Sequence, residues 1–485
     1  MSAGTARGSL VKGSWHGEAV TEGLHSRHYL KVQTYVETCQ PFIPPVLPEA
    51  KPPPFSKGVL RRIIMLTTIS LGQGITLRCI RQSRFKQGCL SLQLLRPMTR
   101  EEAALNALFP AVLLRGTEKS PDLRAITLRL DDLYGASVGA VVRRLGDYQT
   151  TGLICSFIED AYALEGDRIL APMADFLREL LLEPVMEGQG FSRDFVEGEK
   201  TNLISAIDTI RNDKQLYASH QFARLMCRED SLGIPRLGER ADVEAITPEG
   251  LYAHYQKVLR ECPMELFYVG SQAPETVAEL LRPLICSLSR QVQPLPSQTP
   301  FHACEPQSQV EPMDVTQSRL CMGYTTPITF RDDRFAAMQL CSTILGGSMS
   351  NKLFTVIREQ MSLCYDIGSS YNGGKGILSV KAGIDASREE TVRREVGRQL
   401  EACRRGDITE QELSAARQTL ISQLRQVPDS PGSLENYYTS SLIGGLNMEP
   451  ETYMEKLLAV TREDIARAAG TLQLHTVYFL KGEGQ

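Results

Sequence analysis

An arginine and a tyrosine that can both donate hydrogen bonds stand seven residues apart in the second half of the chain, at Arg358 and Tyr365. The guanidinium group is a rigid fork of N–H donors and the phenol is a single O–H donor, so both can hold ligand oxygen atoms. The spacing alone carries little information, because such residues usually have solvated or core roles. The surrounding sequence makes the pair more informative, because Gly346 and Gly347 precede it and a strand-like run over 376–385 follows.

Histidine, the commonest metal ligand and general base, is scattered in this chain. His25 and His28 stand close together in a proline-rich leader, where we interpret them as incidental. The remaining histidines are widely separated and form no pair at helical spacing: His220, His254, His302 and His475. No Ser/His/Asp or Cys/His arrangement stands out. A scattered histidine is more often a surface or hydrogen-bonded structural residue than a ligand, so the sequence predicts no alternative metal site.

The bulk composition is typical of a reduced globular protein. A chain of 485 residues with 42% hydrophobic and 23% charged residues is long enough for two to four domains. The net charge of −4 indicates neither nucleic acid nor an anionic membrane as a partner. Twelve cysteines without C-x-x-C spacing are typical of buried thiols. With no apolar run of about 20 residues and no secretory signal, we predict a cytoplasmic protein without a membrane partner.

Two proline-rich segments divide the chain. Residues 1–64 hold seven prolines from Pro41 onward, which exclude a helix or a central strand there, and we interpret them as a disordered leader. An ordered-looking strand begins after Met65, so our hypothesis is that translation begins at that residue. Residues 287–317 are rich in Pro, Gln and Ser and predict an interdomain linker. The predicted folded parts are then 65–286 and 318–485.

The two folded parts repeat each other. The segment 245–251 (AITPEGL) is answered by 459–465 (AVTREDI), and each is followed by a strand that ends in glycine. Earlier in each part, 111–117 is answered by 342–348 at a similar offset, which indicates a duplicated unit of roughly 210 residues. Each unit runs strands, helices, strands, helices, strand. This order predicts the α+β class, with an antiparallel sheet in each half and helices packed on it.

Individual elements of this plan can be placed from periodicity and capping signals. The predicted strands are 74–80, 88–95, 153–158 and 377–384. The predicted helices are 100–114, 167–182, 195–211 and 215–226. Thr247 is expected to cap a helix that begins at Pro248, and Thr409 with Glu412 is expected to form a capping box.

With this duplication, residues 66–484 resemble the insulinase- or pitrilysin-type (M16) zinc peptidases. In that family the second half carries a helix ending in I-R-E-x-x-x-L-x-Y. The matching residues here are Ile357, Arg358, Glu359, Leu363 and Tyr365. The resemblance implies two homologous halves around a central peptide-binding cavity. It also implies that Arg358 donates forked hydrogen bonds to substrate carbonyls, and that Tyr365 donates to the oxyanion of a tetrahedral intermediate.

The residues that would bind zinc are replaced. An active family member carries H-x-x-E-H on its first long helix, where two histidines bind zinc and the glutamate is the general base. Here Ala107 and Ala111 stand at the histidine positions, and Pro110 stands at the glutamate position. The third ligand position, on a later helix, holds Ala206. The resemblance therefore implies no zinc and no other cofactor in this chain. Pro110 is also expected to kink or end the helix, at a cost of roughly 3 kcal/mol.

Retained Arg/Tyr with lost ligands resembles the zinc-less subunit of two-subunit bacterial M16 enzymes, and in particular the paralogue associated with 5-aminopentanol modification of elongation factor P. The resemblance implies a non-catalytic, substrate-binding subunit whose partner is a paralogous M16 subunit with an intact H-x-x-E-H motif and its zinc. The substrate is then a peptide or unfolded polypeptide, and the chain alone is predicted to have no peptidase activity. Two alternatives stay open: a degenerate scaffold with a structural or assembly role, and a chaperone-like module acting alone.

A peptide held in this fold is expected to bind by strand addition, in which main-chain hydrogen bonds give sequence-tolerant affinity. We predict the strand over 377–384 and its first-half counterpart over 153–158 as the strands that receive it.

Overall fold

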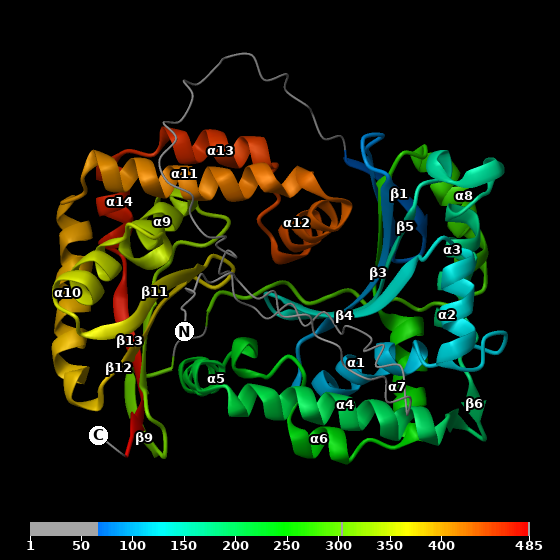
Figure 1. The fold of residues 1–485 in the computed structure, drawn as a ribbon, viewed down its shortest axis with the longest axis horizontal. Coiled ribbons are helices and arrows are strands. Elements are labelled where there is room, and N and C mark those ends of the chain that lie inside the picture. The colour runs from blue at the N-terminus through cyan, green and yellow to red at the C-terminus, as the bar shows by residue number, and fades with distance from the viewer. Residues whose placement is uncertain (1–65, 302–303, 484–485) are drawn as a thin grey trace, which may run out of the picture.

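Two β-sheets, each with its own helices, make up the molecule (Figure 1). The computed structural model describes residues 66–301 and 304–483. The predicted leader over 1–64 and the start at Met65 lie outside the described residues, and so do His25, His28 and His302. Within the described ranges, no helix has both the length and the apolar character needed to cross a membrane.

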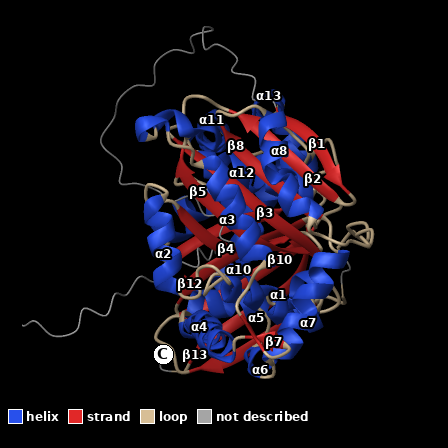
Figure 2. Cartoon of the chain, turned by 90° about the vertical axis from the view of Figure 1, so that its right-hand side faces the viewer, coloured by secondary structure: helices blue, strands red, loops and turns tan. Residues whose placement is uncertain are grey.

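The first half contains a six-stranded sheet. Its strands are β1 (Leu66–Gly72), β2 (Ile75–Arg81), β3 (Gln87–Pro97), β4 (Ser137–Leu145), β5 (Tyr148–Ile158) and β8 (Met264–Gly270). The short strands β6 (Met186–Glu187) and β7 (Gly190–Phe191) pair separately. The helices are α1 (Arg100–Leu113), α2 (Leu123–Asp132), α3 (Leu170–Leu182), α4 (Arg193–Asn212), α5 (Lys214–Met226), α6 (Arg240–Glu244), α7 (Pro248–Glu261) and α8 (Pro274–Cys286). Figures 1 and 2 show α2, α3 and α8 on the outer side of the sheet.

The second half contains a five-stranded sheet. Its strands are β9 (Gln307–Met313), β10 (Ser318–Thr325), β11 (Cys364–Asn372), β12 (Ile377–Ile384) and β13 (Gln473–Gly482). The α-helices are α9 (Phe335–Ser342), α10 (Glu389–Arg405), α11 (Glu410–Gln426), α12 (Pro431–Gly444), α13 (Pro450–Ala459) and α14 (Arg462–Ala469). Two π-helical segments, Thr343–Gly347 and Phe354–Gln360, lie between α9 and β11.

The two sheets have the same topology, which confirms the predicted fold class of two similar α+β halves. The first sheet runs β1-β2-β8-β3-β5-β4, and the second, read from its other end, runs β9-β13-β10-β12-β11. In each sheet one pair is parallel, β2 with β8 and β9 with β13, and the other pairs are antiparallel. Only β1 has no counterpart in the described part of the second half.

The predicted linker differs from an unstructured connection. Its residues 307–313 form β9, which the sequence hides because Gln, Ser and Pro dominate it. Upstream, Gln291 N–H donates to the carbonyl of Arg260 at 2.9 Å, and Thr299 N–H donates to Asp147 Oδ2 at 2.7 Å. The segment is therefore extended, but it is bonded to the first half before it joins the second sheet.

Each half lends one helix to the other half's sheet (Figure 1). Helix α5 packs on β10 and β13, where Phe222 and Met226 contact Tyr478 and its neighbours. Helix α12 packs on β3, β4 and β8, where Leu434 and Tyr438 join the apolar side chains of the first sheet. Burial of such apolar area is the main favourable contribution to folding. The halves are therefore joined by an exchange of helices as well as by the connecting segment.

Most of the predicted elements are present with small shifts at their ends. Thr409 and Glu412 form the predicted capping box, with Glu412 N–H donating to Thr409 Oγ1 at 3.1 Å. Thr247 accepts a hydrogen bond from Gly250 N–H at 3.1 Å and caps α7, which begins at Pro248.

The prediction that Pro110 kinks or ends its helix is wrong about the end, because α1 continues to Leu113. Pro110 has no N–H for the carbonyl of Asn106, four residues earlier. The hydroxyl of Thr151 on β5 donates to that carbonyl instead, at 2.6 Å and fully buried. A side-chain donor from the sheet thus supplies the missing bond.

Candidate functional site

The predicted Arg/Tyr pair lies at an irregular stretch of backbone. Arg358 belongs to the π-helical segment Phe354–Gln360, in which Met361 N–H donates to the carbonyl of Val356 at 3.0 Å. Ser362 follows with a φ of 51°, a left-handed conformation that is uncommon outside glycine. π-Helical turns are rare and frequently mark functional sites. This irregularity is observed independently of any family motif.

The structure brings Arg358 and Tyr365 together. Arg358 Nε donates to the backbone carbonyl of Tyr365 at 2.9 Å, and its guanidinium carbon lies 4.7 Å from the ring centroid of Phe354. Tyr365 is the second residue of β11 and is 58% exposed. We call Arg358 and Tyr365 the clamp pair.

Asp385, which the sequence did not single out, holds the phenol of Tyr365. Tyr365 Oη donates to Asp385 Oδ1 at 3.0 Å, and this hydrogen bond raises the pKa of the Tyr365 hydroxyl above its usual range. The Tyr365 proton is therefore engaged in the chain on its own, and a ligand oxygen must displace Asp385 to receive it. Asp385 follows β12 directly, and nothing in its local sequence indicates a contact with Tyr365, 20 residues earlier.

Of the two glycines before the clamp pair, Gly346 has a packing reason. A Cβ atom on Gly346 would lie 2.5 Å from the backbone nitrogen of Ser369 on β11, closer than real contacts allow. Two further residues fix the start of the π-helical segment. Asn351 Oδ1 accepts from Phe354 N–H at 2.7 Å, and the buried Lys352 donates to the carbonyl of Asp407 at 2.7 Å. Gly346 therefore lets the other π-helical segment, Thr343–Gly347, approach the strand that carries Tyr365.

The four degenerate metal positions offer no ligand atoms. Ala107 and Pro110 are buried on α1, while Ala111 and, on α4, Ala206 are half-buried. The buried Glu199 on α4 is already paired with Arg115, whose Nη1 lies 3.2 Å from Glu199 Oε1. Methyl groups and a pyrrolidine ring cannot coordinate zinc, so the residues do not fit the metal. Across 66–301 and 304–483, no group of three or more His, Cys, Asp or Glu side chains is placed to hold a metal ion.

The purified chain is expected to contain no stoichiometric zinc, because the α1 and α4 positions have lost every donor atom. Elemental analysis after dialysis checks this, with a zinc peptidase prepared in parallel as the positive control. A result of about one tightly bound zinc per chain would contradict the prediction, since a structural or catalytic site needs three or four protein ligands.

His254 has a structural role beside the degenerate helix. Its Nε2 is 2.8 Å from Asn106 Oδ1, and Asn106 Nδ2 donates to Gln149 Oε1 at 2.9 Å. All three side chains are buried. Burial lowers the pKa of His254 to about 4, with Glu102, Arg96 and Lys257 as the nearest charged groups. Neutral His254 therefore anchors α7 to α1.

The shifted pKa of His254 predicts a loss of stability in weak acid. The unfolded chain binds a proton at this residue near pH 6.5, whereas the folded chain does so only near pH 4. The free energy of unfolding should therefore be unaffected by His254 above pH 6.5. It should fall by about 1.4 kcal/mol per pH unit between pH 6 and pH 4.5 from this residue alone.

Urea unfolding at several pH values measures this slope, with His254→Gln as the comparison. The variant should have a shallower slope by one proton, although His220, whose pKa burial also lowers to about 4, keeps its own contribution. Identical slopes for the two proteins would contradict the assignment.

Of the other described histidines, His475 is buried and its Nε2 is 2.6 Å from the carbonyl of Cys304.

The prediction that a peptide adds to the strands over 377–384 and 153–158 is wrong. Strand β12 lies between β10 and β11, and β5 lies between β3 and β4, so both sides of each are already paired. Strand addition requires an unpaired edge. The edges in the described residues are β1 and β4 in the first sheet and β9 and β11 in the second. Strand β11 carries Tyr365, and no strand in the described residues pairs with its outer edge.

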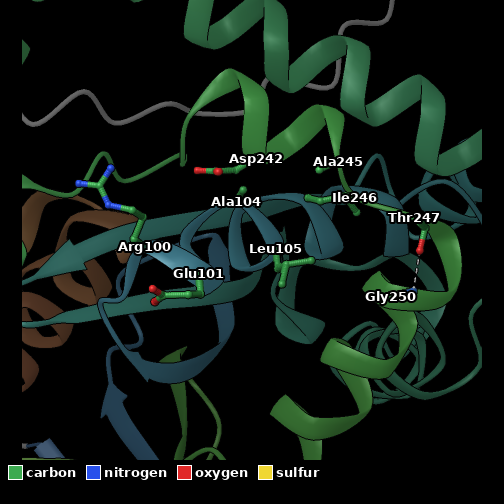
Figure 3. A pocket seen from close by; sticks show the side chains of 9 residues that line it. All are labelled: Arg100, Glu101, Ala104, Leu105, Asp242, Ala245, Ile246, Thr247 and Gly250. Carbon is green, nitrogen blue, oxygen red and sulfur yellow. Dashed lines mark hydrogen bonds between the residues drawn. The ribbon is translucent and has the colours of Figure 1, made fainter.

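A cavity lies away from the clamp pair, between α1, α6 and α7 (Figure 3). Its volume is about 450 Å³. Its lining residues are Arg100, Glu101, Ala104, Leu105, Asp242, Ala245, Ile246, Thr247 and Gly250. Thr247 is already used as the cap of α7. The cavity is open and brings together no nucleophile, base or metal-ligand set.

Comparison with known proteins agrees with the fold. The family model described as "Peptidase M16 inactive domain" matches residues 245–420. A Bacillus subtilis (strain 168) protein named "Probable inactive metalloprotease YmfF" is 29% identical over 409 residues, covering 84% of this chain and 96% of that protein. An uncharacterized zinc protease of Streptomyces coelicolor is 23% identical over 294 residues, covering 59% of this chain and 64% of that protein.

A solved structure shows the same architecture. The crystal structure of a conserved protein from Enterococcus faecalis V583 has a TM-score of 0.81 at 27% identity, and the match covers 87% of this chain and 99% of that one. The chain is therefore similar to the M16 peptidases and their inactive homologues. The Bacillus relative is named a probable inactive metalloprotease, in agreement with Ala107, Pro110 and Ala111 on α1. The matched model lies outside α1.

Proposed function

We propose that this chain is the zinc-less, substrate-binding subunit of a two-subunit M16 peptidase, supplying the clamp pair to an active site whose zinc lies on a paralogous partner. One observation carries the proposal. The four zinc-motif positions hold no metal ligand, yet the chain has an exposed Arg358 and an exposed Tyr365. Arg358 lies on the π-helical segment and its Nε is 2.9 Å from the carbonyl oxygen of Tyr365. Tyr365 lies on β11, an edge strand among the described residues.

Arg358 is suited to hold the substrate main chain. Its Nε is occupied by the Tyr365 carbonyl, and its two terminal nitrogens remain as the forked donor toward carbonyl oxygens. The stacked Phe354 ring fixes the plane of the guanidinium group, so less rotational freedom is lost when a ligand binds. The open edge of β11 offers main-chain donors and acceptors for the same peptide.

Tyr365 is suited to donate to an oxygen that becomes negative during the reaction. Its hydroxyl is exposed and already points its proton at a carboxylate, Asp385 Oδ1. A substrate oxyanion would replace that carboxylate as acceptor, and a preformed donor is worth about 2.7 to 4 kcal/mol in comparable sites. The substrate class is a peptide or unfolded polypeptide, because main-chain recognition does not depend on sequence.

The partner in this proposal is an M16 subunit with an intact H-x-x-E-H motif, which supplies the zinc. Zinc-protease relatives such as the one in Streptomyces coelicolor support the existence of that type of chain in the family. A cytoplasmic location goes with the proposal, and the eleven described cysteines, all unpaired, support a reducing environment.

The test is to mix the purified chain with the zinc-bearing relative from the same genome and assay cleavage of quenched fluorescent peptides. We expect association by sedimentation and hydrolysis that rises to a plateau at equimolar ratio, with neither chain active alone. Full activity of the zinc-bearing chain alone, unchanged on titration with this chain, would contradict the proposal.

A second function, a degenerate scaffold with an assembly role, is favoured by one observation. Three contacts of the clamp pair are made within the chain: Arg358 Nε with the Tyr365 carbonyl, the Arg358 guanidinium group with the Phe354 ring, and the Tyr365 hydroxyl with Asp385. Such contacts also stabilise a local turn without any ligand. The substitutions argued in the Discussion separate the two functions, because a scaffold needs neither the Tyr365 hydroxyl nor the Arg358 fork for activity.

A further inference from the structure

The internal duplication reveals a difference between the two sheets at one edge. In the first sheet, β1 pairs antiparallel with the outer side of β2, and α8 packs on both strands. Strand β9 has the place of β2 in the second sheet, because each pairs in parallel with the last strand of its sheet's half, β13 or β8. In the described residues no strand pairs with the outer side of β9.

The backbone of β9 offers hydrogen-bonding groups at this open edge. Glu483 N–H donates to the carbonyl of Met313 at 3.2 Å, so the Met313 carbonyl points toward β13. Because main-chain groups alternate in direction along a strand, Ser308 and Val310 direct their N–H and C=O groups away from β13. Pro312 belongs to the same outward set, and its missing N–H leaves no gap in the ladder to β13.

The side chains of β9 have two different environments. Glu311 accepts hydrogen bonds from Tyr217 and Tyr478, each at 2.7 Å, so it faces α5. Val310 points to the other face, in register with Phe479, which is buried in the core of the second half. Val310 is nevertheless 52% exposed. An apolar side chain thus extends the core to an edge that nothing described covers.

The charges around this edge are mostly negative. Glu305 and Asp314 are exposed on either side of β9, and Glu483 is exposed beyond β13. Lys481 is the nearby exposed basic residue on β13. A segment that carries basic residues at its ends therefore meets opposite charges, whereas an acidic segment is repelled.

We propose that the open edge of β9 binds an extended segment of a second polypeptide by strand addition, with an apolar residue beside Val310 and Lys or Arg at both ends. The first half shows what fits: β1, a seven-residue antiparallel strand, fills the equivalent edge there. The sheet order places β9 and β11 at opposite edges. This docking edge is therefore separate from the clamp pair and does not depend on the proposed peptidase role.

The test uses a fluorescein-labelled peptide, Lys-Thr-Val-Thr-Val-Thr-Lys, and the full chain. Binding is followed by fluorescence anisotropy and by hydrogen exchange with mass spectrometry. We expect saturable binding and about tenfold slower exchange in the segment that contains Ser308 and Val310. A peptide with Glu in place of both Lys should bind about three- to tenfold more weakly, and one with proline at its centre should lose binding.

Variants of this chain locate the interaction. Val310→Pro removes one outward N–H, and Val310→Lys removes the apolar contact and repels the basic peptide, so both should weaken binding about tenfold or more. Leu128→Lys, at a comparably exposed leucine on α2, is the matched control and should bind like the original chain. Melting curves identify any variant that fails to fold. If one of the two Val310 variants does not fold, the other is compared with the original chain.

Three outcomes would overturn the proposal. One is no binding of the lysine-flanked peptide at millimolar concentration. Another is binding that protects β11 rather than β9, or that survives both Val310 variants. The third is protection of β9 in the chain alone. If that protection disappears on removal of residues 1–64, the edge is filled by the chain itself. If it disappears on dilution, the edge is filled by a second copy.

Discussion

Tyr365→Phe is expected to lower kcat of the mixed two-subunit enzyme about 10²–10³-fold while KM changes little. Phenylalanine keeps the ring on β11 and removes only the hydroxyl that donates to Asp385 Oδ1 in the isolated chain. Because the side chain is 58% exposed and its hydroxyl bonds at the surface, the melting temperature should stay within a degree or two. Peptide hydrolysis and thermal unfolding, measured on the same preparation, check both parts.

Arg358→Ala serves as the companion variant for Tyr365→Phe. It removes the forked donor and the stacking on Phe354, so both KM and kcat of the mixture should suffer. Glu359→Ala, one residue further along the same exposed stretch, is the matched control and should leave both parameters unchanged. Full activity of the Tyr365→Phe heterodimer would favour the scaffold function instead.

Glu435→Ala is expected to lower the free energy of unfolding by about 3–5 kcal/mol, the second large effect. Glu435 lies on α12 and is fully buried against the first sheet. Its two oxygens accept from Arg143 Nη1 and Nη2 at 3.0 and 2.8 Å, and Oε1 also accepts from Ser91 Oγ at 2.7 Å. Removing the carboxylate leaves the buried Arg143 guanidinium uncompensated. Urea unfolding gives the change in free energy.

Two comparisons show whether the loss comes from the unpaired charge. Glu401→Ala breaks an exposed pair with Arg404 and should cost no more than about 0.5 kcal/mol. The double variant Arg143→Met with Glu435→Leu replaces the buried pair by apolar groups and should recover most of the lost stability. A loss below 1 kcal/mol in Glu435→Ala would mean that α12 does not depend on this ion pair to dock.

The sequence predicts local features well because their causes are local. The Thr409–Glu412 capping box and the Thr247 cap rest on side chains that reach backbone groups within three residues. The clamp pair was predicted through a motif in which Arg358 and Tyr365 are near neighbours. The structure then shows the contact between Arg358 Nε and the Tyr365 carbonyl that this spacing makes possible.

The features that the sequence missed depend on residues far apart in the chain. The bond that lets α1 pass through Pro110 comes from Thr151, 45 residues from the Asn106 carbonyl that it serves. Glu435 meets Arg143 across 292 residues, so no local pattern predicts that α12 belongs on the first sheet. The interior positions of β5 and β12 likewise follow from sheet order, which alternating apolar residues do not determine.

The central claim is that Tyr365 lies at the zinc of the partner subunit. The direct measurement is fluorine NMR of the mixture with the partner's zinc replaced by paramagnetic Co²⁺. The chain carries 3-fluorotyrosine at position 365 or, as a control, at position 162, an exposed tyrosine in the first half. We predict strong paramagnetic broadening or shift of the signal from position 365, absent with Zn²⁺, and little change at position 162. An unaffected signal from position 365 in a verified heterodimer would contradict a shared active site.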